Sequence, residues 1–508
     1  MKRYSAVIDI GSNTMRLVIY AHENESRIQE VENVKIVARL RKYLDEDLNL
    51  TGEGQFILID TLNSFRKVID TYDVDHSFCA ATAAIRQAEN REDIKEKVKA
   101  ETGLEMIILS EEQEAYYGYL AVANSTAVEK GFTVDIGGGS TEITYFEDRR
   151  LIHSHSFPFG SLTLMEFFDE DKPSKKQVKK VREFIEEHFS QLDWIKEKNA
   201  PIVGIGGSAR NMAEIDQTFK DYPLAGLHQY EMFDTDIAHI SEHLTTLDKK
   251  EREKIEGLSK DRADSILPAM QVFHCLYSLT DASSFILSRK GLRDGLLYEQ
   301  LAGPKENHLY ENVLENSIAD LVNEYELSSS QTTYARELTK KLFTPLVDQG
   351  ASTYLTGKDW AITERACTVY NLGSYIDSES SSQHTFYLLA NRTIDGLMHI
   401  DRLKLALLAS FKSKSVYKQF LRPYNNWFLK SEKKKLKLLG AIIKLTYSMD
   451  STKRRIISDL NVTVKEKSIT IRCYCTDDFK PEAYQTEKQK KHLEKALKVP
   501  IHISFHYL

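Results

Sequence analysis

The chain has 508 residues, of which 42% are hydrophobic and 28% are charged, and its formal net charge is −7. This composition is typical of a globular protein with several domains, and the acidic balance excludes a chain-wide basic surface for nucleic acid. A polyanionic ligand would therefore need a local basic site. No apolar run approaches the ~20 residues that span a bilayer, so we expect no membrane segment.

The cysteines and the amino terminus bear on the cellular compartment. Five cysteines are scattered without the spacing of a zinc site or a redox pair, which favours a reducing compartment. The first residues, MKRYSAVIDI, enter a predicted strand at once and carry no apolar signal-peptide core. We therefore expect a cytoplasmic protein.

The first predicted elements are a strand, a turn and a strand, namely SAVIDI, GSNT and MRLVIY. The stretch FCAATAAIRQAENREDIKEKVKAETG starts apolar and becomes a charged helix that stops at Gly103, with Arg86 and Asn90 four residues apart on one helical face. Ser110 and Gln113 match a capping box, so another helix is predicted from Ser110. Strands that alternate with helices predict an α/β fold.

The strand–turn–strand pattern occurs twice. The segments VIDIGSNTMRLVIY and TVDIGGGSTEITYF align without a gap and pair Asp9 with Asp135. Such self-similarity predicts a duplicated supersecondary unit. Seven residues after each aspartate the copies differ, since Arg16 stands in the first and Glu142 in the second.

The remainder of the chain shows three further sequence patterns. A third glycine turn, GIGGS, follows a predicted strand and precedes a helix expected to begin near Ala209. The stretch 258–301 is predicted to be helical, 309–447 to hold long amphipathic helices, and the last residues to form paired strands, a helix and a final strand. The predicted domains are a first lobe at 1–125, a second lobe at 126–303, a helical domain at 304–447 and a small α+β domain at 448–508.

The glycine turns predict a phosphate site. Each turn brings backbone N–H groups together, and such a nest binds anions, phosphate above all. The alternatives are ordinary hairpin turns chosen for positive φ and, for the arginines, solvated side chains. Three such turns in one chain favour phosphate. The predicted phosphate-binding residues are Gly11, Ser12, Asn13, Thr14, Arg16, Arg86, Gly137, Gly138, Gly139, Ser140, Thr141, Gly206, Gly207 and Ser208.

Four carboxylates accompany the turns. Asp9 and Asp135 end predicted strands, where an acid can hold Mg²⁺ beside a bound phosphate. Glu142 suits a metal ion or a nucleophilic water. Glu114, in the first turns of its predicted helix, can orient and deprotonate a water, although an acid that merely favours the helix dipole is the alternative.

Seven segments in order resemble the exopolyphosphatase and guanosine pentaphosphate phosphohydrolase family, Ppx/GppA. They are DIGSNTMRL, ATAAIRQAEN, SEEQEA, DIGGGSTEI, PFGSLTL, GIGGSARNM and RADSILPAM, and they span residues 7–270. The resemblance implies a duplicated ribonuclease H-like two-lobe core of the actin, sugar kinase and Hsp70 type. It also implies that water attacks a terminal phosphoryl group with Mg²⁺, or with Mn²⁺ in its place.

The resemblance also implies residue roles. Glu114 would be the catalytic base and Glu142 a second catalytic acid that positions the metal and the water. Asp9, Asp135 and Glu142 would be the metal ligands. Arg86 is similar to an arginine that family members direct at the phosphate chain. One departure is Gln113, which stands where the family often has a glutamate.

The helical domain resembles the HD-like domain of longer family members. Hydrolytic HD domains bind metal through a His-Asp pair, whereas this chain has Tyr370 and Asn371 there and retains only His384. We therefore expect no second metal site, and instead a structural role that extends a polyphosphate path or forms a homodimer. Lysines within 433–437 and basic residues at 453–455 suit polyanion contacts, but a solvated helix face is the alternative.

The leading prediction is release of terminal orthophosphate from inorganic polyphosphate. The nearest alternative is hydrolysis of guanosine pentaphosphate (pppGpp) to ppGpp by the same residues, and no aromatic box for guanine is evident. Transfer to an acceptor, as in the kinases of the superfold, and non-catalytic binding of polyphosphate or alarmone are two further alternatives. Retention of the three acids Glu114, Asp135 and Glu142 argues against a pure binder.

Overall fold

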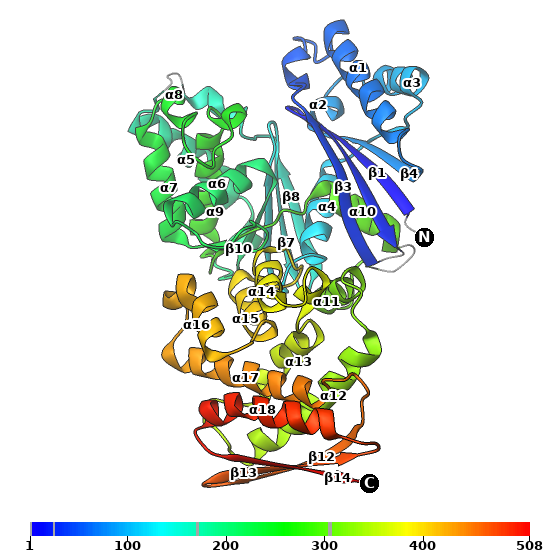
Figure 1. Ribbon diagram of the computed structural model, residues 1–508. Coiled ribbons are helices and arrows are strands. Elements are labelled where there is room, and N and C mark those ends of the chain that lie inside the picture. Colours follow the sequence, from blue (N-terminus) through cyan, green and yellow to red (C-terminus); the bar gives the residue numbers. More distant parts are fainter. Residues whose placement is uncertain (1–2, 24–25, 169–171, 303–306) are drawn as a thin grey trace. The chain divides into compact units, whose positions relative to one another are not determined.

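The computed structural model describes residues 3–23, 26–168, 172–302 and 307–508, and the chain forms two compact units (Figure 1). The first unit comprises residues 1–222 and 227–313, and the second comprises residues 223–226 and 314–508. None of the described helices is long and apolar enough to cross a membrane.

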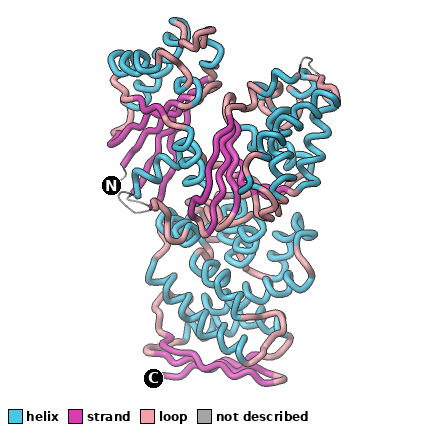
Figure 2. Tube along the Cα trace, turned by 180° about the vertical axis from the view of Figure 1, so that it is seen from behind, coloured by secondary structure: helices cyan, strands magenta, loops and turns pink. Residues whose placement is uncertain are grey.

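The first unit contains two mixed sheets, whose strands are magenta in Figure 2. The first lobe has the strand order β3-β2-β1-β4-β5, and the second lobe has the order β10-β11-β9-β6-β7-β8. The first sheet consists of β1 (Arg3–Ile10), β2 (Met15–Glu23), β3 (Ser26–Ile36), β4 (Val74–Ala81) and β5 (Met106–Ile108). The second consists of β6 (Gly131–Ile136), β7 (Thr141–Glu147), β8 (Arg150–Phe157), β9 (Ile202–Ile205), β10 (Tyr230–Met232) and β11 (Phe285–Leu287).

The two lobes repeat the same hairpin. The strands β1 and β2 are antiparallel and place Asp9 opposite Arg16, while β6 and β7 place Asp135 opposite Glu142. In each turn a glycine N–H donates to the carbonyl three residues later, at 3.0 Å from Gly11 and at 2.9 Å from Gly137. Each first strand then pairs in parallel with a later strand, β4 or β9. The predicted duplication and the α/β two-lobe fold are confirmed.

Helices flank each sheet and close its core. The first-lobe core includes Ile8, Leu17 and Phe65, and the second-lobe core includes Phe132 and Phe273, all of them fully buried or nearly so. The helices of this unit are α1 (Gly52–Ile69), α2 (Ala83–Arg86), α3 (Arg91–Thr102), α4 (Glu111–Ala123), α5 (Lys175–Ser190), α6 (Gly206–Phe219), α7 (Asp234–Thr246), α8 (Lys249–Arg252), α9 (Ile266–Thr280) and α10 (Leu292–Ala302).

Helices α4 and α10 connect the lobes. Helix α4 follows the first sheet but packs against β6, β7 and β8, whereas α10 follows the second sheet but packs against β1. The two helices also lie side by side (Figure 1). Their backbones touch, because a Cβ on Gly295 would lie 2.0 Å from the carbonyl oxygen of Tyr117. Each lobe is therefore completed by a helix from the other half of the sequence.

The second unit is helical with a small sheet at its carboxyl-terminal end. The three-stranded sheet has the order β12-β13-β14, and α18 packs against α17. Its elements are α11 (Val313–Glu324), α12 (Ser329–Asp348), α13 (Trp360–Thr368), α14 (Ser381–Asn391), α15 (His399–Ala409), α16 (Lys414–Leu421), α17 (Lys430–Met449), β12 (Ile457–Lys465), β13 (Ser468–Cys475), α18 (Lys480–Leu497) and β14 (Ile501–Tyr507). The predicted helices and the predicted order of the last elements are confirmed.

Tyr370 and the nearby Ser382 donate hydrogen bonds to backbone carbonyls of residues 410–411. The Tyr370 hydroxyl donates to the carbonyl of Phe411 at 3.0 Å, and the Ser382 hydroxyl donates to the carbonyl of Ser410 at 2.5 Å. Asn371 takes a left-handed backbone conformation before a short 3₁₀ turn. Across the described residues, no group of three or more His, Cys, Asp and Glu side chains is arranged to hold a metal ion.

Three sequence predictions were wrong in detail. The helix expected to carry Arg86 and Asn90 on one face is broken into α2 and α3, because the Asn90 amide bonds both backbone groups of Leu50, at 2.9 and 3.1 Å. The stretch expected to be helical throughout contains the strand β11, which is too short to show a period. Helix α6 begins at Gly206 rather than near Ala209.

Candidate active site

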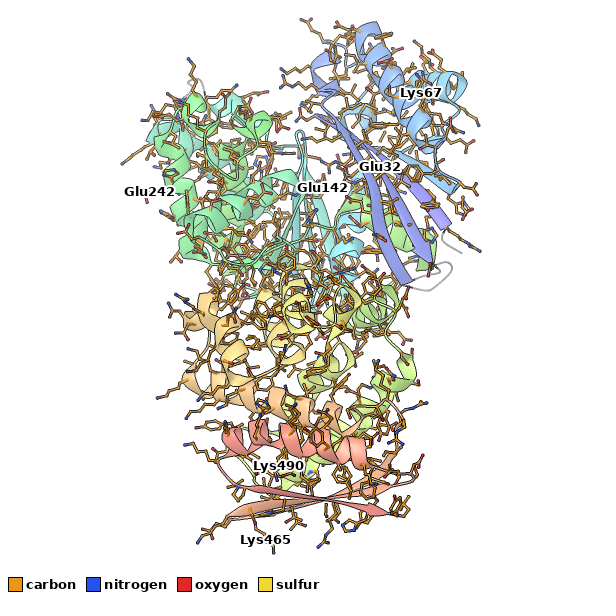
Figure 3. The ribbon with its side chains drawn as sticks, in the orientation of Figure 1. Glu32, Lys67, Glu142, Glu242, Lys465 and Lys490 are labelled. Carbon is orange, nitrogen blue, oxygen red and sulfur yellow. The ribbon has the colours of Figure 1, made fainter. Side chains whose placement is uncertain are left out.

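A polar cavity of about 230 Å³ lies where the glycine turns of the two lobes meet. Glu142, which is labelled in Figure 3, lies on the strand that follows the second turn. Most of the predicted site residues line the cavity. These are Asp9, Gly11, Ser12, Asn13, Thr14, Arg16, Glu114, Asp135, Gly137, Gly138, Gly139, Ser140, Glu142, Gly206 and Gly207.

Three predicted phosphate contacts are instead engaged with the protein. The Thr141 hydroxyl donates to the carbonyl of Phe159 at 2.7 Å, which anchors the end of the second turn. The Ser208 hydroxyl accepts from the Arg262 guanidinium at 3.4 Å. Arg86 binds Glu114 and is described below. For these three, the geometry favours support of the site over direct contact with a ligand in the cavity.

The strand registers set two rows of side chains toward the cavity. Across β1, β2 and β3 the row is Asp9, Arg16 and Lys35. Across β6, β7 and β8 the corresponding row is Asp135, Glu142 and Ser156. Because cross-strand partners point to the same face of a sheet, both rows begin with an aspartate, and the first lobe then presents the cations Arg16 and Lys35 where the second presents Glu142 and Ser156.

The second glycine turn is supported from behind by the segment after β8. The N–H groups of Ser161 and Leu162 donate to the carbonyls of Gly137 and Gly138, both at 2.9 Å. A Cβ on Gly160 would lie 2.5 Å from the Gly137 oxygen, so only glycine fits there. This packing fixes the turn and leaves its other side open to the cavity.

The third turn is the start of α6. Gly206 has a φ of +83°, and a Cβ there would lie 2.5 Å from Oδ1 of Asp135. The first N–H groups of a helix have no partner within the helix, and together with its dipole they favour an anion. The helix start and the two hairpin turns therefore form a site suited to phosphate.

Glu114 is held by a cation and is mostly buried, with 17% of its side chain exposed. The Arg86 guanidinium donates to Oε2 of Glu114 at 2.8 Å and to the carbonyl of Leu109 at 3.0 Å. The predicted capping box at Ser110 is confirmed and starts the helix that carries Glu114. Burial raises the pKa of Glu114 to about 7, and the pairing with Arg86 only partly opposes this rise. A carboxylate with such a pKa is suited to accept a proton near neutral pH.

The environment of Asp135 and Glu142 also favours their neutral forms. Burial, followed by repulsion from Asp9, raises the pKa of Asp135 to about 6. Burial, with Glu114 and Asp135 nearby, raises the pKa of Glu142 well above its ordinary value, although Ser156 donates to Glu142 Oε1 at 3.2 Å. Because the ionised forms of these neighbouring carboxylates repel one another, the binding of a cation beside them would be favourable.

Five basic residues of the cavity were missed from the sequence: Lys35, Arg210, Arg262, Arg289 and Arg293. Arg293 donates to Oδ2 of Asp9 at 2.8 Å and so joins α10 to β1. Burial, then repulsion from Arg293 and Arg210, lowers the pKa of Arg16 to about 10. Arg210 and Arg262 lie inside the motifs GIGGSARNM and RADSILPAM, and their place in these motifs could have identified them as site residues.

The comparison with known protein families matches residues 18–303 to the Ppx/GppA phosphatase family. The chain belongs to this family. Residues 313–494 match domain III of Ppx/GppA phosphatases. This match confirms the resemblance found in the sequence. It also confirms the prediction that the protein is a hydrolase.

Two named relatives are 25% and 27% identical to this chain. A guanosine-5'-triphosphate,3'-diphosphate pyrophosphatase of Vibrio parahaemolyticus is 25% identical over 422 residues, which cover 80% of this chain and 79% of that protein. Exopolyphosphatase 1 of Mycobacterium tuberculosis is 27% identical over 310 residues, which cover 58% of this chain and 87% of that protein.

Solved Ppx/GppA structures share the fold of the two lobes. The Aquifex aeolicus family member is 30% identical with a TM-score of 0.54, covering 58% of this chain and 97% of that one. An exopolyphosphatase from Cytophaga hutchinsonii has the same TM-score at 23% identity, covering 60% of this chain and 99% of that one, and supports the fold alone.

The raised pKa of Asp135 predicts that Asp135→Asn stabilises the ligand-free protein. Between pH 3.8, the ordinary pKa, and about pH 6, the Asp135 carboxyl is protonated in the folded state but ionised in the unfolded state. The free energy of unfolding therefore falls as pH rises through this window. At pH 8 the Asn variant escapes this cost and is expected to gain about 1–3 kcal/mol, since one pKa unit corresponds to ~1.4 kcal/mol. Urea unfolding at pH 8 and pH 5 measures it.

The matched control is Asp60→Asn, which changes an exposed carboxylate on α1. It should leave the free energy of unfolding unchanged at both pH values. A destabilised Asp135→Asn protein at pH 8 would contradict the prediction.

Proposed function

We propose that this Ppx/GppA phosphatase removes terminal orthophosphate from inorganic polyphosphate. The observation that carries the proposal is the cavity lining. It combines six basic side chains, four acidic ones and three glycine-rich turns, and no aromatic side chain is among the described residues that line it. A chain of phosphates needs cations and N–H donors along its length, whereas a purine also needs a flat apolar contact.

In the proposed reaction the substrate's terminal phosphoryl group lies against the turn N–H groups. Glu114, positioned by Arg86, accepts a proton from the attacking water. The new O–P bond forms as the bridging P–O bond breaks, releasing orthophosphate and a chain one phosphate shorter. Arg16 and the neighbouring arginines offset the charge that spreads over the phosphoryl oxygens.

We propose Mg²⁺, or Mn²⁺ in its place, as the cofactor. Asp135 and Glu142 are adjacent in register, and Glu142 is buried while Asp135 is partly buried. Two such carboxylates fit a hard cation that takes one or two of them and leaves its other positions to water and phosphate. Asp9 is already bound by Arg293 and fits less well. When bound, such an ion polarises phosphoryl oxygens and orients the water.

The second candidate is hydrolysis of pppGpp to ppGpp. It is favoured by the relative named for that substrate, because that match covers 80% of this chain. Both substrates end in a phosphoanhydride, so the same residues would serve. A homodimer and a cytoplasmic location remain predictions from the sequence, and sedimentation of the full chain tests the first.

The deciding experiment measures phosphate release by the full chain with Mg²⁺ from long-chain polyphosphate and from pppGpp. We expect the higher kcat/KM for polyphosphate and loss of release from both substrates when Mg²⁺ is chelated. A preference for pppGpp would transfer the assignment to the second candidate, and no release from either substrate would exclude the hydrolase assignment.

A further inference from the structure

An ion pair joins the two lobes at the cavity. Nζ of Lys35, on β3 of the first lobe, lies 2.9 Å from Oδ2 of Asp261, which belongs to a short 3₁₀ turn (Lys260–Arg262) of the second lobe. The two residues are 226 positions apart in sequence. Both side chains are partly exposed, at 34% and 24%, so the pair lies at a rim that water reaches.

Lys35 is placed to contact a ligand. It lines the cavity and ends the row Asp9, Arg16, Lys35 across the first sheet. Neighbouring strands are ~4.8 Å apart, so each step along this row moves outward by about that distance. Lys35 therefore stands two strands away from Asp9, on the edge strand of the sheet. A phosphate chain whose end lies at the glycine turns can extend toward this edge.

Asp261 forms an ion pair with the lysine that such a chain would contact. Although burial favours its neutral form, the bond from Lys35 holds the pKa of Asp261 below its ordinary value, so Asp261 is an anion. Its neighbour Arg262 lines the cavity and lies against Gly207. A carboxylate at the rim of an anion site repels the anion and competes with it for the lysine.

We propose that Lys35 binds a non-terminal phosphoryl group of the substrate, and that Asp261 is the carboxylate that this group displaces. The proposal rests on the proposed function and deepens it, since only a substrate with phosphates beyond the terminal one reaches Lys35. Asp261 then sets the KM for chains without touching the reacting phosphorus.

The test is a KM-against-kcat comparison with long-chain polyphosphate at 0.15 M salt. Asp261→Asn is expected to lower KM about threefold with little change in kcat, because it frees Lys35 and removes a repulsive charge. Lys35→Met is expected to raise KM about tenfold, as for loss of a charge-assisted contact. In the double variant the gain from Asp261→Asn should disappear, because the lysine that it frees is absent.

A matched control is Glu147→Gln, which breaks the Lys130–Glu147 pair at 2.8 Å on the same unit but outside the cavity. It should leave KM and kcat unchanged, and thermal melting checks that every variant is folded. An unchanged or raised KM in Asp261→Asn would overturn the proposal and make the pair a structural clamp.

A measurement of polyphosphate binding distinguishes failure of this inference from failure of the proposed function. Calorimetric titration of each variant with long-chain polyphosphate in the absence of Mg²⁺ measures the Kd without turnover. If the wild type binds but does not hydrolyse, the Kd values still test Lys35 and Asp261. If the wild type does not bind polyphosphate at all, both the inference and the proposed function are overturned.

Discussion

Glu114→Gln is expected to lower kcat for phosphate release by about 10²–10⁴-fold, which is the usual contribution of a general base. The amide keeps the size of the side chain and an oxygen that can accept from Arg86 at the 2.8 Å contact, but it cannot take a proton from water. KM should change little, because the glycine turns and the arginines still hold the phosphates. Steady-state kinetics on polyphosphate with Mg²⁺ measures both constants.

The matched control for this substitution is Glu111→Gln. Glu111 lies in the first turn of the same helix, and its carboxylate is 46% exposed and 3.8 Å from Arg86. This control should retain nearly full kcat. Activity retained by Glu114→Gln would remove Glu114 from its role as the base.

The pH profile gives a second readout. Because the base must be ionised and burial raises the pKa of Glu114 to about 7, wild-type kcat/KM should rise as pH rises through about 7. The residual activity of Glu114→Gln should lack this rise.

Gly160→Ala is expected to lower kcat/KM by about 10²-fold without removing any group that contacts substrate, since a misplacement of ~1 Å in a catalytic site can cost this much. The new Cβ would lie 2.5 Å from the Gly137 oxygen and 2.8 Å from the carbonyl carbon of Gly138. Those are backbone atoms, so the phosphate turn itself must shift. Overpacking should also lower the free energy of unfolding by about 1–3 kcal/mol.

A suitable control is Gly52→Ala at the start of α1, where an added Cβ has nothing within 4 Å. Its kinetics and unfolding should match the wild type. If Gly160→Ala kept full activity, the turn would not depend on the segment behind it.

The hairpins and their acids could be predicted because their information is local. The gap-free repeat predicted two equivalent hairpins with Arg16 and Glu142 at the same position, and a short turn fixes the register of its two strands. The structure places Asp9 opposite Arg16 and Asp135 opposite Glu142. The capping box at Ser110 is local as well, and it fixed where the helix of Glu114 begins.

The parts of the fold and of the site that the sequence did not predict depend on contacts between distant segments. Lys35 enters its row only through the pairing of β3, a strand that shows no distinctive motif, and Arg293 reaches Asp9 only because α10 packs on the first sheet. The break between α2 and α3 depends on Leu50, which is 40 residues from Asn90. No periodicity or spacing in one sequence reports such partners.

The repeated hairpin also bears on how such a site can arise. Two identical lobes meeting across a dyad must place the same side chain on both walls, so a symmetric ancestor would carry an arginine on both or a glutamate on both. Fusing two copies into one polypeptide lifts that restriction. In this chain Arg16 and Glu142 stand at equivalent positions of the two hairpins, so one wall of the cavity carries a cation where the other carries a carboxylate.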